Sequence, residues 1–134
     1  MKPRVIKIGG STLRSTRDLV RAAEVIQLYR HPIVVVSAFH GVTDTLHRLA
    51  SGTPTAAEIH ETCLALRHQH NVLVNTIADN RQRRIALLSI DRLFHELERL
   101  LDGASKLGEV PDFAYAKILS YGERLSAVIL RHTL

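Results

Sequence analysis

The sequence has 134 residues, of which 46% are apolar, which is enough for one domain with a hydrophobic core and excludes a disordered chain. The net charge of +5 favours an anionic ligand such as a nucleotide, whereas an aromatic fraction of 4% leaves few rings to stack on bases and excludes a typical nucleic-acid platform. A single cysteine rules out an internal disulfide, and no apolar run approaches the roughly 20 residues of a membrane span, so we expect a cytoplasmic protein without a membrane partner.

A β-branched run at residues 5–8 predicts a strand that is covered on both faces. Gly9 and Gly10 follow it, and because they lack Cβ atoms their amides are free to face an anion. Thr16 is the expected N-cap of a helix that should end near residues 29–30, before a proline. An ordinary tight turn is the alternative interpretation of the glycine pair.

A second β-branched run at residues 33–36 predicts another strand, and a helix should begin at residues 42–44. A strand–helix–strand crossover brings both carboxyl ends to the same edge of a parallel sheet, which is where such sheets bind ligands. We therefore expect a set of polar residues and glycines to converge there, namely Lys7, Gly9, Gly10, Ser37 and Thr43. Taken singly, each of these side chains also has an ordinary structural explanation, such as a solvated lysine, a strand-end hydroxyl or a helix N-cap.

The middle of the chain is predicted to be a helical hairpin. Thr55 and Glu58 have the spacing of a capping box that opens the first helix, and a break is expected at residues 79–80. The second helix should end with Gly103 as its C-terminal cap. These boundaries define a helical insert at residues 55–103.

The last segment is predicted to contain two helices. A proline at position 111 suits the start of a helix that runs to about Leu119. Gly122 then either interrupts the helix or lets another segment approach closely, and Glu123 begins the final helix, with Ser120 and Glu123 spaced as a capping box.

Three blocks of this sequence resemble, in order, the amino-terminal motifs of aspartate kinases of the amino acid kinase family. Residues 7–12, the first block, resemble the family's Lys-Phe-Gly-Gly-Thr-Ser motif. The second block, residues 36–43, resembles Val-Ser-Ala followed by Val-Thr, and the third, residues 120–126, resembles Ser-x-Gly-Glu-x-x-Ser. The resemblance implies an α/β fold, the three-layer parallel-sheet amino acid kinase fold, of which residues 1–134 would be the N-terminal part.

The resemblance also implies an activity and its site. The parent reaction moves the γ-phosphoryl group of ATP to the side-chain carboxylate of L-aspartate, giving 4-phospho-L-aspartate for lysine, threonine and methionine synthesis. Lys7 would be the catalytic cation, and Lys7, Gly9, Gly10 and Ser11 would hold the phosphates of ATP. A second group would bind the substrate, namely Ser37, Thr43 and Glu123. Mg²⁺ is expected to accompany ATP, although no metal ligand is identified in this chain.

Two predicted strands do not make a self-sufficient parallel sheet, so we expect an incomplete domain that is inactive by itself. Such a chain should form a homo-oligomer or bind a complementing C-terminal part. Two other functions remain as alternatives. One is a non-catalytic module that acts only by association with another chain, and the other is a kinase of the same fold with a different acceptor.

Overall fold

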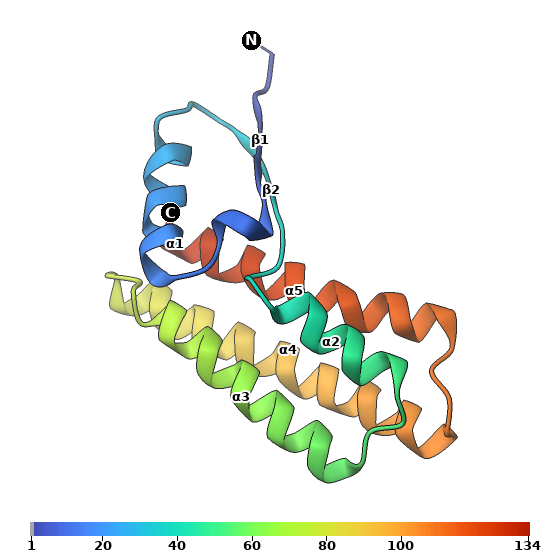
Figure 1. Cartoon of the computed structure of the whole chain (residues 1–134). Helices are drawn as coiled ribbons and strands as arrows, with labels where there is room; N and C mark the ends of the chain where they lie inside the picture. The colour runs from blue at the N-terminus through green and yellow to red at the C-terminus, as the bar shows by residue number, and fades with distance from the viewer. Residues whose placement is uncertain (1) are drawn as a thin grey trace.

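The computed structural model describes residues 2–134, which form two strands, a short 3₁₀ turn and five α-helices (Figure 1). In chain order they are β1 (Val5–Ile8), η1 (Gly10–Thr12), α1 (Thr16–Gln27), β2 (Ile33–Val36), α2 (Val42–Ser51), α3 (Ala56–Val74), α4 (Asn80–Leu107) and α5 (Asp112–Thr133). Figure 1 shows α2, α3, α4 and α5 stacked side by side, with the strands and α1 at one end of the stack.

The two strands pair in parallel across α1, from Val5 opposite Ile33 to Ile8 opposite Val36. This confirms both predicted strands and the crossover between them. The expectation that β1 is covered on both faces is wrong for the part of the chain that the structure describes. One face packs on the core, whereas Val5, Ile33 and Val35 on the other face are 63%, 51% and 49% exposed. No described helix covers that second face, which is why apolar side chains remain at the surface.

Helix α1 begins at Thr16, one residue earlier than expected, because Ser15 and not Thr16 is its N-cap. The Ser15 hydroxyl accepts a hydrogen bond from the amide of Asp18, at 3.2 Å. The helix also ends at Gln27, before the expected residues 29–30, in a turn where the Tyr29 amide donates to the Ile26 carbonyl. Serine and threonine are both good caps, so their adjacency made the choice ambiguous.

The helical hairpin of α3 and α4 is confirmed, as is the capping box that opens it. The Glu58 amide donates to the Thr55 hydroxyl, and the Glu58 carboxylate accepts from the Thr55 amide at 2.7 Å. The prediction that Gly103 ends the hairpin is wrong, since α4 continues to Leu107. Gly108 is the actual cap, with a φ of +76°, a backbone conformation that favours glycine.

Helix α5 is continuous from Asp112 to Thr133, so the predicted break near Gly122 and the second capping box are wrong. The Ser120 hydroxyl donates to the Lys117 carbonyl one turn earlier and does not cap a new helix. Tyr121 and Leu125, both almost fully buried, hold this part of α5 in the core. Tertiary packing on both sides of the glycine therefore outweighs its low helix propensity.

Candidate phosphate-binding edge

The carboxyl ends of the two strands meet at one edge of the sheet. Ile8 lies opposite Val36, and the amide of Ser37 donates to the Ile8 carbonyl at 2.9 Å. The hydrogen-bond ladder therefore extends one residue past β2 and fixes the start of the second block beside the start of the first. Gly9 is the next residue after Ile8, at this same edge.

Gly10 brings the first block against the second. A Cβ atom at position 10 would lie 3.1 Å from the carbonyl oxygen of Ala38 and 3.8 Å from the Cβ of Ser37. A contact of 3.1 Å with a backbone oxygen leaves little room for a side chain, so glycine permits this approach. The convergence that was predicted from the order of strands is confirmed for Gly10 and Ser37.

Gly122 brings the third block against the other side of the same turn. A Cβ atom at position 122 would lie 2.8 Å from the Cβ of Ala38 and 3.5 Å from Cγ1 of Val42. Of the two roles predicted for Gly122, close approach is confirmed and helix interruption is wrong. Ala38 thus lies between two glycines from distant parts of the chain. Ala38 belongs to the Val-Ser-Ala motif of the second block, but nothing local in the sequence marks it as the point of contact.

The hydroxyls of the first block have different environments. The Thr12 hydroxyl donates to the Gly9 carbonyl at 2.6 Å and so stabilises the 3₁₀ turn. Ser11 is exposed, and its carbonyl accepts from Nε of Arg14 at 3.0 Å. Of the two, the Ser11 side chain is therefore the one available to an external group.

The three remaining predicted residues are all exposed. Lys7 lies on the uncovered face of the sheet, in register with Val35. Thr43 lies in the first turn of α2, whose N-cap, Gly41, has a φ of +81°. Glu123 lies inside α5, next to Gly122 and not at a helix start. Lys7 and Glu123 are near the edge because they adjoin Ile8 and Gly122 in the chain. Within residues 2–134 neither side chain forms an ion pair, with the other or with any third residue.

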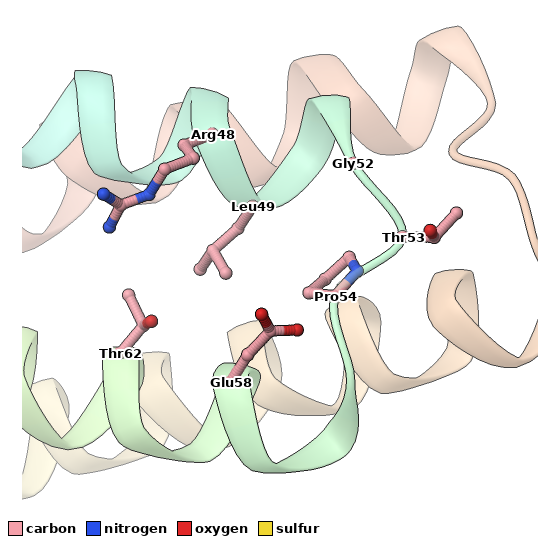
Figure 2. A pocket seen from close by; sticks show the side chains of 7 residues that line it. All are labelled: Arg48, Leu49, Gly52, Thr53, Pro54, Glu58 and Thr62. Carbon is pink, nitrogen blue, oxygen red and sulfur yellow. The ribbon is translucent and has the colours of Figure 1, made fainter.

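A surface pocket of about 450 Å³ lies elsewhere, between the end of α2 and the start of α3 (Figure 2). Arg48 and Thr62 line it from the two helices, and Glu58 points toward it while it also caps α3. None of the predicted site residues is among those lining this pocket. The contacts of the three blocks, and not this pocket, therefore define the candidate site.

Two observations bear on other chemistry. Among residues 2–134 there is no group of three or more His, Cys, Asp or Glu side chains that is arranged to hold a metal ion. Burial raises the pKa of the Cys63 thiol to about 12, which keeps it neutral and unreactive near pH 7. Cys63, which lies inside α3, therefore serves helix packing. No helix described by the structure is both long and apolar enough to cross a membrane.

A family model, the amino acid kinase family, matches residues 2–134. The chain belongs to the amino acid kinase family. Among curated amino acid kinases, it is 27% identical over 128 residues to an aspartokinase of Chlamydia trachomatis serovar D and 29% identical over 128 residues to one of Chlamydia muridarum. These matches cover 96% of this chain but only 27% and 26% of the relatives, so the chain spans about a quarter of their length.

Solved structures of the family share the fold. Crystal structures of E. coli aspartokinase III, one with aspartate and ADP and one with lysine and aspartate, each superpose with a TM-score of 0.84. The sequence identities are 22% and 24%, and each match covers 98% of this chain and 28% of the E. coli chain. The expected α/β amino acid kinase fold is therefore confirmed, and so is the resemblance to the amino-terminal part of an aspartate kinase.

Proposed function

We propose that this chain forms the phosphate- and acceptor-binding edge of an aspartate kinase, in which the γ-phosphoryl group of ATP moves to the side-chain carboxylate of L-aspartate. The observation that carries the proposal is the contact of all three blocks around Ala38, between Gly10 and Gly122. These blocks are separated by up to about a hundred residues of chain, and the order of elements brings them to one place. The product, 4-phospho-L-aspartate, would enter lysine, threonine and methionine synthesis.

The proposed chemistry needs alignment and charge more than it needs a general base. A carboxylate acceptor is already ionised near pH 7, so no proton has to be removed before attack. The barrier is lowered by holding the acceptor in line and by stabilising the charge on the transferring oxygens. Lys7 would supply a compact positive charge, and the amides of Gly9 and Gly10 with the Ser11 hydroxyl would bind phosphate oxygens.

The acceptor would lie on the side of the second and third blocks. Ser37 and Thr43 offer hydroxyls to its carboxylates, and both belong to segments that Ala38 and Val42 fix against α5. Glu123 repels carboxylates, so in this proposal it binds the ammonium group of aspartate. Mg²⁺ would arrive with ATP, bound to its phosphate oxygens.

The uncovered face of the sheet favours a second candidate, a module that acts only through association with another chain. Val5, Ile33 and Val35 form an apolar strip there, and such strips mark interaction surfaces. Association through this face would also serve the kinase proposal, because a chain that spans about a quarter of its relatives needs other segments to complete the family's domain.

An assay of ATP-dependent phosphorylation of L-aspartate separates these candidates. We expect negligible turnover by the chain alone. We expect turnover when the chain is fused to the part of E. coli aspartokinase III that the structural match does not cover. A fusion that folds and binds ATP but phosphorylates another carboxylate better than aspartate would replace the proposed acceptor, and a folded fusion without any phosphotransfer would favour the association module.

A further inference from the structure

His70 of α3 is completely buried, with 0% of its surface exposed, and only one of its ring nitrogens has a partner. Nδ1 lies 2.7 Å from the carbonyl oxygen of Leu66, one turn earlier. A carbonyl only accepts, so Nδ1 carries the proton and Nε2 is a bare acceptor. In the described part of the chain Nε2 has no hydrogen-bond partner. A buried acceptor without a partner is costly, which sets this histidine apart from an ordinary core residue.

Two aromatic rings approach His70 from other elements. The Phe39 ring lies 6.0 Å away at an interplanar angle of 89°, and the Phe94 ring of α4 lies 5.6 Å away at 72°. Phe39 directly follows Ala38 of the second block and is only 2% exposed. The next residue, His40, is exposed, but its amide donates to the Leu13 carbonyl at 2.8 Å. His70 is therefore a point at which the helical hairpin touches the turn of the candidate site.

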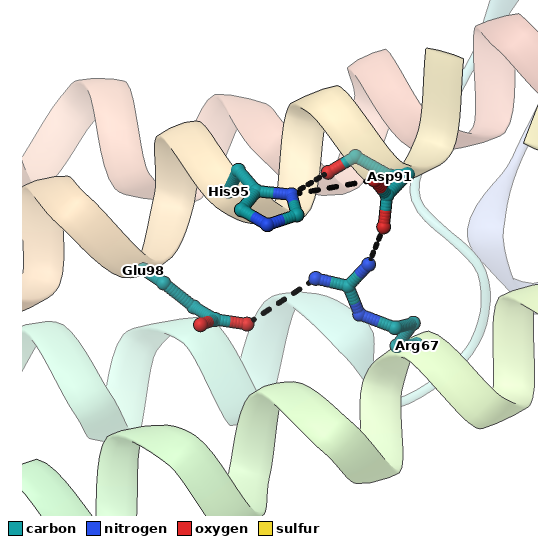
Figure 3. A network of polar contacts seen from close by, with 4 residues as sticks. All are labelled: Arg67, Asp91, His95 and Glu98. Carbon is teal, nitrogen blue, oxygen red and sulfur yellow. Dashed lines mark hydrogen bonds and ion pairs between the residues drawn. The ribbon is translucent and has the colours of Figure 1, made fainter. Parts of the chain in front are cut away.

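Few charged groups surround this ring. On α3, Cys63 is buried and neutral, because burial raises the pKa of its thiol to about 12. The Arg67 guanidinium lies 5.2 Å from the centre of the Phe94 ring and is engaged by two carboxylates of α4 (Figure 3). Burial lowers the pKa of His70, and the Leu66 carbonyl opposes this only in part. The surroundings thus favour the neutral ring.

We propose that His70 is a positioning residue: its neutral ring holds Phe39 and thereby the turn at residues 37–41, and protonation of the ring releases that turn. A protonated Nε2 would be a donor without an acceptor in an apolar site. Opening the turn would expose the ring to water and remove this cost. This proposal rests on the proposed function, which gives the turn its importance. Hydrogen exchange measures the opening of the turn and not catalysis, so the role of His70 and the kinase function can fail separately.

The direction of the pH dependence follows from linkage. The His70 pKa in the closed state lies below its ordinary value of 6.5, so as pH falls the open state binds the proton first. The closed turn therefore has its full stability above pH 6.5. Its stability falls as the pH drops from 6.5 to the lowered pKa, and it falls no further below that pKa. Uptake of one proton over the pH unit from 6.5 to 5.5 changes the closing equilibrium by at most about tenfold.

Hydrogen exchange of the whole chain at pH 7.5 and 5.5, corrected for intrinsic rates, tests the proposal. The reporters are the amides of Ser37 and His40, which are bonded to the Ile8 and Leu13 carbonyls. We expect their protection to fall at pH 5.5, by up to about tenfold, while amides inside α1 keep theirs. His70→Phe should abolish this fall, and His68→Phe, at an exposed position on the same helix, should preserve it. An equal fall in wild type and His70→Phe would overturn the proposal.

A measurement on the wild-type chain covers the case in which His70→Phe does not fold. Nitrogen-15 spectra should show the neutral His70 ring protonated at Nδ1, and ring protonation should coincide with changes in the Phe39 signals. Protonation of His70 with unchanged Phe39 signals and unchanged exchange at residues 37–41 would show that the ring does not hold the turn.

Discussion

Position 122 requires glycine because Ala38 packs against it, and not because of its backbone conformation, which is helical. The 2.8 Å that would separate an added Cβ from the Cβ of Ala38 is shorter than real contacts allow. Gly103 is the useful contrast, since it also lies inside a long helix but has nothing within 4 Å of an added Cβ. The same residue type therefore has opposite roles in α4 and α5.

We expect Gly122→Ala to destabilise the protein by about 1–3 kcal/mol, because the new methyl group overpacks the contact with Ala38. Gly103→Ala should instead stabilise it by up to about 1 kcal/mol, through better helix propensity. Urea unfolding of both variants measures the difference. Equal stabilities for the two alanine variants would mean that α5 can shift away from the turn at no cost.

At the scale of elements, the sequence predicted the strands and the opening of the helical hairpin, which depend on local signals. The two β-branched runs became strands at the expected residues, and the capping box of Thr55 and Glu58 opened α3 as expected. Two helix boundaries were misplaced where nearby residues offered similar caps, since Ser15 and Gly108 are the actual caps of α1 and α4. The error in α5 occurred because distant packing decides there. Ser120 and Glu123 have the spacing of a second capping box, yet burial of Tyr121 and Leu125 keeps α5 continuous. Convergence at the sheet edge followed from strand order, but the contact point at Ala38 did not, because nothing local in the sequence marks it.

The capping box gives a pH-dependent prediction at this scale. Hydrogen bonds from the backbone and then the side chain of Thr55 lower the pKa of Glu58. Its stabilising effect is therefore present above the ordinary value of 4.5 and is lost as pH falls through the lowered pKa. We expect Glu58→Gln to lower the melting temperature at pH 7, and the difference from the wild type to shrink as the pH falls through the lowered pKa and the wild-type carboxyl becomes protonated.

Glu61→Gln is the matched control for this experiment, since Glu61 is an exposed acid on the same helix and makes no hydrogen bond or ion pair within residues 2–134. Its melting temperature should follow that of the wild type across this pH range. If both glutamine variants behaved alike, the effect at Glu58 would reflect overall charge and not the cap.

At the scale of the whole molecule, the sheet is the part that lacks a covering layer, since one of its faces is exposed among the described residues. A two-stranded parallel sheet with one apolar face in water is marginal without a covering layer. The rest of the molecule has a packed core, in which Phe94 and Leu97 of α4 and Ile118 of α5 are fully buried. Association is therefore expected to involve the sheet and not the helical hairpin.

We expect the purified chain to associate in a concentration-dependent way, through the exposed face that carries Val5 and Val35. Replacing both with threonine keeps the β-branched shape but adds polar groups, so it should shift the equilibrium toward monomer. Leu88→Thr removes an even more exposed apolar residue, on α4, and should leave association unchanged. Light scattering across a range of concentrations measures all three proteins. A wild-type chain that stays monomeric throughout would show that the sheet face tolerates water.

The central claim is that the edge formed by the three blocks carries the phosphoryl transfer, and Lys7 tests it most directly. In a fusion of this chain to the uncovered part of E. coli aspartokinase III, Lys7→Ala should lower kcat by on the order of a hundredfold, with an unchanged melting temperature. Lys7→Arg should not restore it, because a planar guanidinium does not replace a compact charge. Lys106→Ala, which removes an exposed lysine paired with Asp102 on α4, should keep kcat. Turnover by a folded Lys7→Ala fusion within a few-fold of the parent would contradict the account.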